Sequence, residues 1–294
     1  MIAALLVSPA AGRGVAARIA GTVAQRLRGS VDRLDTLVAD SAAGSAALAK
    51  DAVAAGVDVL VVLGGDGLAH TAVQACAGSP TALAVIPAGT GNDLARALAT
   101  PADPLAATLL TADALRVGHT RRIDLGRVAG GSWFATVLCA GFDSAVSERV
   151  NALRWPPGPR RYDLAIVTEL TKLKAKPLVV ETDDTTLRLD ATMVSVGNSR
   201  FYGGGIPICP DAELDDGLFD VTVVGATHRR DLLRILPRLR TGRHIEHPSV
   251  TTLRARSVCL SGLNHWVAYA DGERQARLPL TIRCQPAALN VLGA

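Results

Sequence analysis

The sequence predicts an α/β domain with a doubly wound parallel sheet, followed by a larger, mostly antiparallel β domain. Over the first ~118 residues, short apolar runs alternate with helix-forming stretches, which is typical of a parallel sheet covered by helices on both faces. From about Arg121 onwards, apolar and polar residues alternate instead, as in GLFDVTVV and SVTTLRARSVCL. We therefore expect two domains, at residues 1–118 and 119–294, with the extreme C-terminus a candidate to return to the first domain.

The first domain is expected to hold strand–helix units in succession. Its strands are short runs of aliphatic residues, at 2–7, 35–38, 57–63 and 83–86. Its helices are expected at 15–27, 45–55, 68–77 and 92–98. Ligands of such sheets bind beyond the carboxyl ends of the strands, so the loops that follow the strands are the first places to look for a site.

The second domain is expected to consist of antiparallel strands interrupted by two helical regions. Asp183 and Asp184 separate two alternating segments and predict a tight hairpin turn. The helical regions are 144–153, with a continuation at 162–174, and 228–239. A proline-rich segment at 155–159 is either a lid or a helix breaker.

The composition argues against nucleic acid as a partner. The chain has 31 Lys and Arg against 27 Asp and Glu, and aromatic residues make up only 3%, too few for a platform on which bases stack. An anionic membrane surface or a phosphorylated substrate stays compatible with this charge. The five cysteines are widely spaced with no CxxC, which fits neither a disulfide framework nor a zinc site and indicates a reducing compartment.

The chain is expected to be cytoplasmic, without a transmembrane segment. Its apolar runs are shorter than the ~18 residues of a membrane-spanning helix, and the N-terminal run lacks the basic residues of a signal peptide. One helical stretch carries arginines beside an apolar stripe, at Arg230, Arg234 and Arg238. This stretch is either a surface that contacts a membrane or an ordinary helix with a solvated basic face.

Three glycine-containing loops follow strands of the first domain. They are Gly64-Gly65-Asp66-Gly67, Gly89-Thr90-Gly91-Asn92-Asp93, and the loop from Ser8 to Gly14. Backbone N–H groups at such junctions can face an anion, and Asn92 or Asp93 can cap the helix that follows. Asp66 would repel a phosphate unless a divalent cation lay between them. The loops therefore predict a site for a nucleotide with a metal ion.

Each loop alone has a simpler explanation. A single Gly-Asp-Gly is often only a turn, but three loops at successive strand ends favour a functional site. A Walker A sequence is absent. Gly12 to Ala17 match a dinucleotide fingerprint, yet four residues separate this match from the strand, where a Rossmann turn follows at once.

The order of several motifs resembles a known family. GGDG at 64–67 and PAGTGNDLAR at 87–96 are similar to the catalytic domain of the diacylglycerol kinase and sphingoid-base kinase family, in its branch of bacterial soluble lipid kinases. Further matches run along the chain: RIDLG at 122–126, GFD at 141–143, YGGG at 202–205, PDAELDDGL at 210–218 and DGE at 271–273. The resemblance implies a small α/β nucleotide domain and a larger β-sandwich domain, with ATP in the cleft between them.

The resemblance also implies roles for individual residues. ATP would be bound by Pro9, Ala10, Ala11, Gly12, Asp40, Gly64, Gly65, Asp66, Gly67, Leu68, His70, Gly89, Thr90, Gly91, Asn92 and Asp93. Its phosphates would be held by residues 64–70, by Thr90 and by the loop at 9–12. Glu273, supported by Asp271, would take the proton from the lipid hydroxyl. Asp66, Asp93 and Asp124 would organise the catalytic metal and the cleft. A structural Mg²⁺ would be held by Asp216 with the backbone carbonyls of Glu213 and Leu218.

Departures from the family pattern fall in the same loops. Leu68 stands where Thr is usual, which removes a hydroxyl from the phosphate loop, and His70 stands where Asn is usual. Ser8 and Ala11 stand where the family tends to have Asn and Ser, and Asp40 lies near a position where a Thr often approaches the nucleotide. These changes leave open whether ATP is the preferred donor.

The function expected from this resemblance is that of an ATP- and Mg²⁺-dependent lipid kinase working at a membrane surface. Its leading reaction is the conversion of diacylglycerol to phosphatidic acid, and a sphingoid base or a monoacylglycerol is an alternative acceptor. NAD kinases share GGDG, but the Asn-Glu pair that is typical of those enzymes is missing here. A nucleotide-binding regulator without catalysis is an alternative function. A homodimer is a possible oligomeric state.

Overall fold

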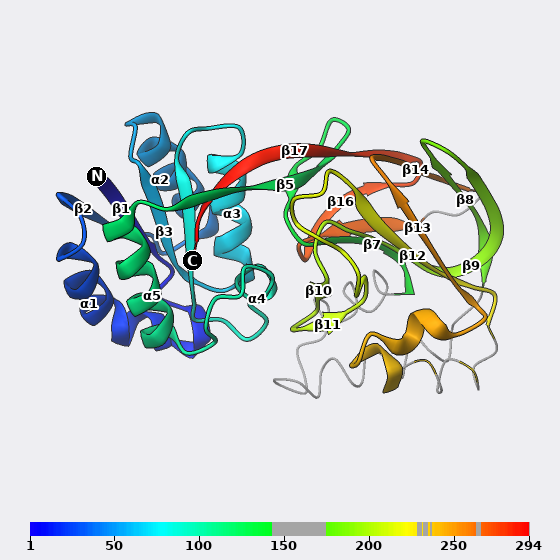
Figure 1. Ribbon diagram of the computed structural model, residues 1–294, viewed down its shortest axis with the longest axis horizontal. Helices are drawn as coiled ribbons and strands as arrows, with labels where there is room; N and C mark the ends of the chain where they lie inside the picture. Colours follow the sequence, from blue (N-terminus) through cyan, green and yellow to red (C-terminus); the bar gives the residue numbers. More distant parts are fainter. Residues whose placement is uncertain (143–174, 228–230, 232–234, 236, 263–265, 294) are drawn as a thin grey trace.

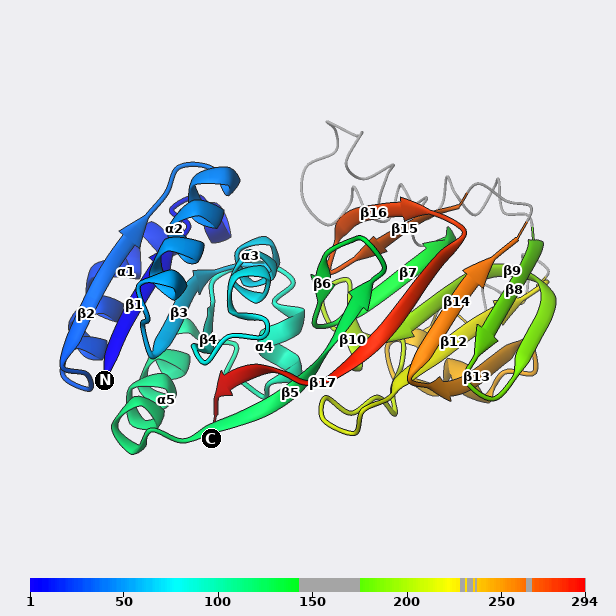
Figure 2. The same cartoon turned by 90° about the horizontal axis from the view of Figure 1, so that it is seen from above.

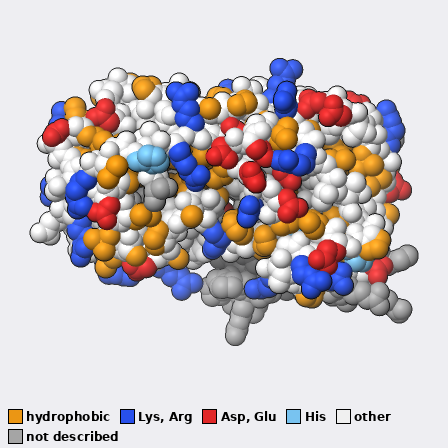
Figure 3. All heavy atoms as spheres, viewed as in Figure 1, with side chains coloured by type: hydrophobic (Ala, Val, Ile, Leu, Met, Phe, Trp, Pro, Cys, Tyr) orange, Lys and Arg blue, Asp and Glu red, His pale blue; other side chains and the backbone are white. Residues whose placement is uncertain are grey.

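A computed structural model describes residues 1–142, 175–227, 231, 235, 237–262 and 266–293. The chain folds into an α/β domain and a β domain that lie side by side and are joined by two long strands (Figure 1). Near the middle of the face seen in Figure 3, acidic side chains gather with basic side chains beside them. In the described part of the chain, no helix is long and apolar enough to cross a membrane.

The first domain is built on parallel strands in the order β2–β1–β3–β4. These are β1 (Ile2–Val7), β2 (Arg33–Val38), β3 (Val59–Gly64) and β4 (Ala82–Pro87). Every residue of β3 and β4 is buried, as expected for strands covered on both faces. The predicted doubly wound parallel sheet is therefore confirmed.

Helices cover both faces of this sheet (Figure 2). They are α1 (Val15–Arg28), α2 (Ala42–Ala54), α3 (Asp66–Cys76), the short α4 (Asp93–Ala97) and α5 (Pro104–Val117). Successive side chains of β1 point to opposite faces, so Leu5 packs in the core under α1 and α5, and Leu6 in the core under α2 and α3. A short 3₁₀ helix, η1 (Ala11–Arg13), precedes α1.

No element was predicted at 104–117, where the structure has α5. Its start is marked by Asp103, whose side chain accepts a hydrogen bond from the N–H of Ala106 at 2.7 Å, and by proline at its first position. Its end is marked by Gly118 in the left-handed conformation. Leu109 and Val117 are exposed on this helix, which weakens the apolar period that a sequence search relies on.

The second domain is an array of antiparallel strands, as predicted. Its elements are β6 (Trp133–Phe134), β7 (Val137–Gly141), β8 (Lys176–Thr182), β9 (Thr186–Gly197), β10 (Phe201–Tyr202), β11 (Ile206–Pro207), β12 (Phe219–Gly225), η2 (Arg243–Glu246), β13 (Val250–Ala255), β14 (Ser257–Ser261), β15 (Val267–Ala270) and β16 (Glu273–Arg277). The predicted turn at Asp183 and Asp184 joins β8 to β9. Phe134 and Phe219 stack in its core with ring centroids 5.8 Å apart.

Two strands run from one domain into the other, β5 (Thr120–Val128) and β17 (Leu280–Leu292) (Figures 1 and 2). They pair antiparallel, with an irregularity between Gln285 and Leu289. The early part of β17 pairs with β14, whereas Val291 pairs parallel with Leu83 of β4. Strand β17 therefore joins the strands of both domains into one continuous sheet.

Some predicted elements lie outside the described residues. These are the helical stretches at 144–153 and 162–174 and the proline-rich segment at 155–159. Most of the stretch at 228–239 is also outside, and of its three arginines only Arg238 is described.

Candidate active site

The three predicted loops meet at the carboxyl edge of the parallel sheet. A Cβ atom on Gly12, which has φ +58°, would lie 2.2 Å from the carbonyl oxygen of Ala88. A Cβ atom on Gly89 would lie 2.5 Å from Cα of Gly65. Both positions require glycine because backbone packs against backbone there. The loops thus form one unit, as their places at strand ends predict.

Asp66 joins the second loop to the third. Its carboxylate accepts hydrogen bonds from the N–H groups of Asn92 at 2.8 Å and Asp93 at 2.7 Å. These N–H groups open helix α4, where a negative charge is favourable. Asp66 thus satisfies its charge with backbone donors, and the cation that the sequence argument required is not needed for that purpose. Its role in organising a metal stays a prediction.

Asn92 does not cap α4, contrary to one sequence expectation. Its side chain turns back to Gly89, accepting from the N–H at 3.0 Å and donating to the carbonyl at 2.9 Å. With φ +56°, Asn92 also lies in the left-handed region. The capping group comes instead from Asp66, 26 positions earlier in the chain. Spacing alone could not reveal this exchange.

Asp93 links the glycine loops to the second domain. Its buried carboxylate accepts hydrogen bonds from the N–H groups of Gly204 at 3.0 Å and Gly205 at 2.7 Å. Burial raises the pKa of Asp93 above its usual value, and the charge of Asp66 adds to this, while the N–H donors oppose it. The YGGG motif is thus held against the start of α4.

Asp124 performs a similar task where β5 leaves the first domain. Its buried carboxylate accepts from the N–H of Gly217 at 2.6 Å and from the N–H of Ala287 at 2.7 Å. Ala287 lies in the irregular part of β17 and has φ +52°. Asp124 therefore fixes the loop that contains Gly217 and the bend of β17 together.

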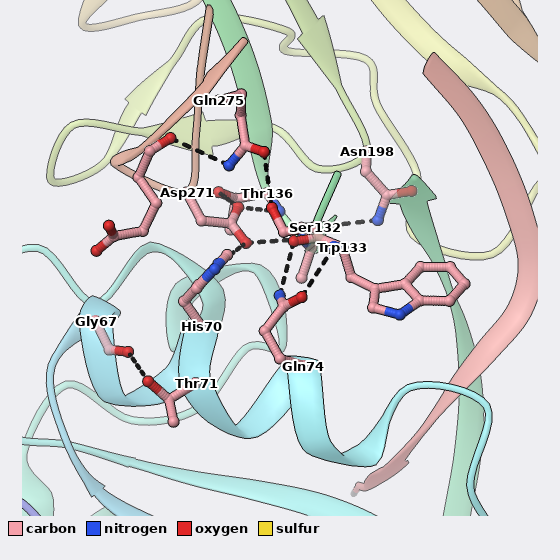
Figure 4. A network of polar contacts seen from close by, with 12 residues as sticks. Gly67, His70, Thr71, Gln74, Ser132, Trp133, Thr136, Asn198, Asp271 and Gln275 are labelled. Atoms are coloured by element: carbon pink, nitrogen blue, oxygen red, sulfur yellow. Dashed lines mark hydrogen bonds and ion pairs between the residues drawn. The ribbon is translucent and has the colours of Figure 1, made fainter. Parts of the chain in front are cut away.

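Asp271 occupies the turn between β15 and β16, at φ +51°. It accepts hydrogen bonds from the N–H of Ala135 at 2.9 Å, the N–H of Thr136 at 2.8 Å and the hydroxyl of Thr136 at 2.5 Å. His70 of α3 approaches the same carboxylate through Nδ1 at 3.2 Å (Figure 4). Asp271 thus has little capacity left to accept a proton from a substrate.

The contact with Asp271 also affects the charge of His70. Burial lowers the pKa of His70, but the hydrogen bond to Asp271 and the charges of Asp271 and Glu273 outweigh it, so the pKa lies above its usual value. The imidazole joins helix α3 of the first domain to the hairpin of the second (Figure 4).

Gln74, one turn further along α3, makes a second junction that the sequence did not reveal. Its amide accepts from the N–H of Trp133 at 3.0 Å and donates to the carbonyl of Trp133 at 2.8 Å (Figure 4). His70 and Gln74 are spaced i, i+4, so they share one face of the helix. This spacing was the available signal.

Glu273 differs from these aspartates. It is exposed at the start of β16, and its carboxylate has no hydrogen bond or ion pair with any residue that the structure describes. Its charge acts on His70, so the two side chains lie near each other. Of the two carboxylates predicted to accept a proton, Glu273 is the one with accessible lone pairs.

A cavity of about 800 Å³ lies where the two domains face each other. The predicted residues that line it are Pro9, Ala10, Asp40, Gly67, Leu68, His70 and Glu273. The other predicted residues of the loops do not line it, namely Ala11, Gly12, Gly64, Gly65, Asp66, Gly89, Thr90, Gly91, Asn92 and Asp93. Of these residues, Thr90 is exposed.

Other lining residues were missed by sequence reasoning. They are Ala39, Ser41, Ala42, Ser45, Thr71, Ser132, Arg274 and Gln275, whereas Ser8, which also lines the cavity, belongs to the predicted loop from Ser8 to Gly14. Several belong to the β2–α2 junction, where Ser41 caps α2 by accepting from the N–H of Gly44 at 3.1 Å. The position of this loop at the same carboxyl edge was the signal that could have found it.

The side chain of Leu68, which breaks the family pattern, turns inward. It is 7% exposed, and a Cβ atom on Gly64 would lie 2.7 Å from its Cδ2 atom. Leu68 therefore stabilises the turn between β3 and α3 from inside.

Both carboxylate oxygens of Asp216, the side chain predicted to hold a structural Mg²⁺, have protein partners. One oxygen of Asp216 accepts from the N–H of Leu218 at 2.9 Å, and the other pairs with the guanidinium of Arg254. Within the described ranges, no cluster of three or more His, Cys, Asp or Glu side chains is arranged to hold a metal. The donors at Asp216 do not fit a divalent cation in this arrangement, and we derive no step through one.

Family models match both halves of the chain. Residues 3–128 match the diacylglycerol kinase catalytic domain, and residues 136–293 match the YegS C-terminal NAD kinase beta sandwich-like domain. A diacylglycerol kinase of Mycobacterium tuberculosis is 40% identical over 296 residues, which covers 98% of this chain and 93% of the relative. A diacylglycerol kinase of Staphylococcus epidermidis is 32% identical over 225 residues, covering 76% of this chain and 70% of the relative.

Solved structures share the fold. A crystal structure from Bacillus anthracis superposes with a TM-score of 0.82 at 22% identity, covering 99% of this chain and 95% of that one. A crystal structure of a diacylglycerol kinase from the same organism gives a TM-score of 0.77 at 20% identity, covering 99% and 96%. The α/β domain followed by a β-sandwich domain is therefore the fold of this chain.

Proposed function

The chain belongs to the diacylglycerol kinase family of lipid kinases, and we propose that it transfers the γ-phosphate of ATP to the hydroxyl of diacylglycerol to give phosphatidic acid. One observation carries this proposal. The cavity between the domains is lined on one side by the first turns of α3 and on the other by Glu273. A phosphate donor and a proton acceptor thus have places across the same space.

The phosphates of the nucleotide would lie at the start of α3. Gly67 and Leu68 line the cavity there, and the N-terminus of a helix carries partial positive charge and N–H donors that suit a phosphate. The base and ribose would extend along the loops of β1 and β2, past Pro9, Asp40 and Ser41. The cavity volume of about 800 Å³ is within the usual range for a site of this kind.

Glu273 would act as the general base. The lipid hydroxyl oxygen attacks the γ-phosphorus and forms a new P–O bond while the bond to the bridging oxygen of ADP breaks. The hydroxyl proton passes to the carboxylate of Glu273, which is accessible in the cavity. We propose that Mg²⁺ enters as part of the nucleotide substrate, since the motif aspartates already bind backbone N–H groups.

The acceptor brings the enzyme to a membrane. Because diacylglycerol is confined to lipid, we propose that the protein works as a peripheral enzyme in the cytoplasm, with the cavity open toward the bilayer. We expect the protein to sediment when it is mixed with anionic vesicles that contain diacylglycerol, and to stay in the supernatant when no vesicles are present.

The activity can be tested with labelled ATP and mixed vesicles. Purified protein, Mg²⁺ and vesicles that contain diacylglycerol should yield labelled phosphatidic acid, with a known diacylglycerol kinase run in parallel. Parallel reactions with monoacylglycerol, a sphingoid base and NAD identify the acceptor. Label on another lipid would replace diacylglycerol, and label on NAD would replace the lipid altogether. Nucleotide binding without transfer to any acceptor would contradict catalysis.

A further inference from the structure

A short loop between β11 and β12 is held by contacts that cross the domain junction. The N–H of Asp124 donates to the carbonyl of Leu214 at 2.7 Å, and the N–H of Gly217 donates to the carboxylate of Asp124 at 2.6 Å. The loop closes on itself through Asp216, whose carboxylate accepts from the N–H of Leu218 at 2.9 Å. We call residues 214–218 the DDG loop.

Arg254 of β13 bridges the DDG loop to the next strand. Its guanidinium pairs with the free oxygen of Asp216 and, through Nε at 3.3 Å, with the carboxylate of Asp220. Asp220 and Arg254 face each other directly in the register of β12 and β13. The sheet itself therefore delivers the guanidinium to this place, since cross-strand neighbours are fixed by the register.

The two carboxylates need a positive partner. The side chains of Asp216 and Asp220 are 20% and 13% exposed, so water screens them only in part. Without the guanidinium, like charges would lie together at partly buried positions.

We propose that Arg254 is a built-in counter-ion for the DDG loop, taking the place of the structural divalent cation that the family resemblance assigns to Asp216. The loop then keeps its shape without bound metal. This inference does not depend on the proposed function, since it concerns what holds the loop rather than what the cavity binds.

The chemistry of the two cations favours the guanidinium here. Mg²⁺ requires nearly octahedral oxygen ligands at about 2.0–2.1 Å and gives up water reluctantly. Arginine keeps its charge at all relevant pH values and offers several N–H donors in a fixed plane, which suits two separate carboxylates. A metal ion at Asp216 would have to displace Arg254 and leave two cations side by side.

The counter-ion also acts on the connection between the domains. Gly217 of the DDG loop and Ala287 of β17 donate to the same carboxylate, that of Asp124. If the DDG loop moved, Asp124 would lose one of its donors at the bend of β17. Arg254 therefore helps to hold the two domains in their relative positions, although it does not line the cavity.

Thermal unfolding of the full chain tests this proposal without any kinase assay. Wild-type protein should unfold at the same temperature in EDTA and in 10 mM MgCl₂, with ionic strength matched by NaCl. Arg254→Gln should unfold about 2–4 °C lower in EDTA. It should regain part of this loss in MgCl₂, because its freed carboxylates can then bind the ion. Arg256→Gln is the control, since Arg256 directly follows β13, is exposed and has no side-chain partner in the described structure.

Two results would overturn the proposal. One is a saturable rise in the unfolding temperature of the wild type with Mg²⁺ that Asp216→Asn removes, which would show that the ion binds despite Arg254. The other is an Arg254→Gln protein as stable as the wild type in EDTA. If Arg254→Gln does not fold, the wild-type titration still decides, and Arg254→Lys, which keeps the charge, should fold and stay insensitive to Mg²⁺.

Discussion

The glycine loops of the first domain and the β15–β16 hairpin of the second both bring carboxylates to the domain junction, but they use them differently. In the loops, Asp66 and Asp93 each bind two backbone N–H groups. In the hairpin, Asp271 is bound in the same way, whereas Glu273 two residues later stays exposed. The difference shows that an acidic residue in a motif can have a structural role and need not take part in the reaction. We infer that the aspartates build the cleft and that the glutamate is left for catalysis.

The sharpest test of this contrast is Glu273→Gln. The amide keeps the shape of the side chain but cannot accept a proton, so we expect kcat to fall by about 10²–10⁴-fold. The unfolding temperature should change little, because the carboxylate accepts no hydrogen bond from the described residues and acts on His70 only through its charge. Glu181→Gln, at an exposed position of β8, is the control. A turnover equal to that of the wild type would remove Glu273 from the mechanism.

Asp66→Ala should show the opposite combination. Two charge-assisted hydrogen bonds are lost and two N–H groups at the start of α4 lose their acceptor, so we expect a loss of about 2–3 kcal/mol in the free energy of unfolding. Transfer should be lost as well, because the loops separate. Urea titration with Asp51→Ala as the control measures the effect. A stable but inactive protein would instead support a direct role of Asp66 with a metal.

Gly89→Ala tests the contact between the loops without changing any charge. The added Cβ would lie 2.5 Å from Cα of Gly65, so the loops must separate, at a cost of about 1–3 kcal/mol. Gly67→Ala is a matched control, because a Cβ atom there meets no atom within 4 Å. Equal unfolding free energies for the two variants would show that the loops do not need this close approach.

His70 should make the smallest contribution, and one that depends on pH. Its pKa is raised in the folded state, so the stabilisation is fully present below the unfolded pKa of about 6.5 and is lost as pH rises through the folded pKa. The difference in unfolding free energy between wild type and His70→Asn should therefore shrink from pH 6 to pH 9, by about 1 kcal/mol. His119→Asn, at an exposed histidine that has no ion pair in the described structure, is the comparison variant. A constant difference for His70→Asn would contradict the ion pair with Asp271.

The sequence was sufficient for the features that follow from local pattern. The parallel sheet and the meeting of the three loops follow from strands that end at one edge, and both are present. The partners of Asp66 and Arg254 could not be predicted in the same way. The partners of Asp66 depend on how two loops pack, and those of Arg254 depend on the register of β12 against β13. Neither can be inferred from the spacing of residues along the chain. Helix α5 was not predicted, because it has leucines at exposed positions as well as on its buried face, and these obscure the apolar period.

The path of β17 has a consequence for how the molecule comes into being. Leu289 and Val291 lie in the core of the first domain, beside Leu83 and Ile123, although more than half of the chain separates them from β4. During synthesis, the first domain would wait with one edge of its sheet unfinished until almost the whole second domain has left the ribosome. The two domains would therefore be completed in the same late step, and the cleft between them would exist only once that step is done.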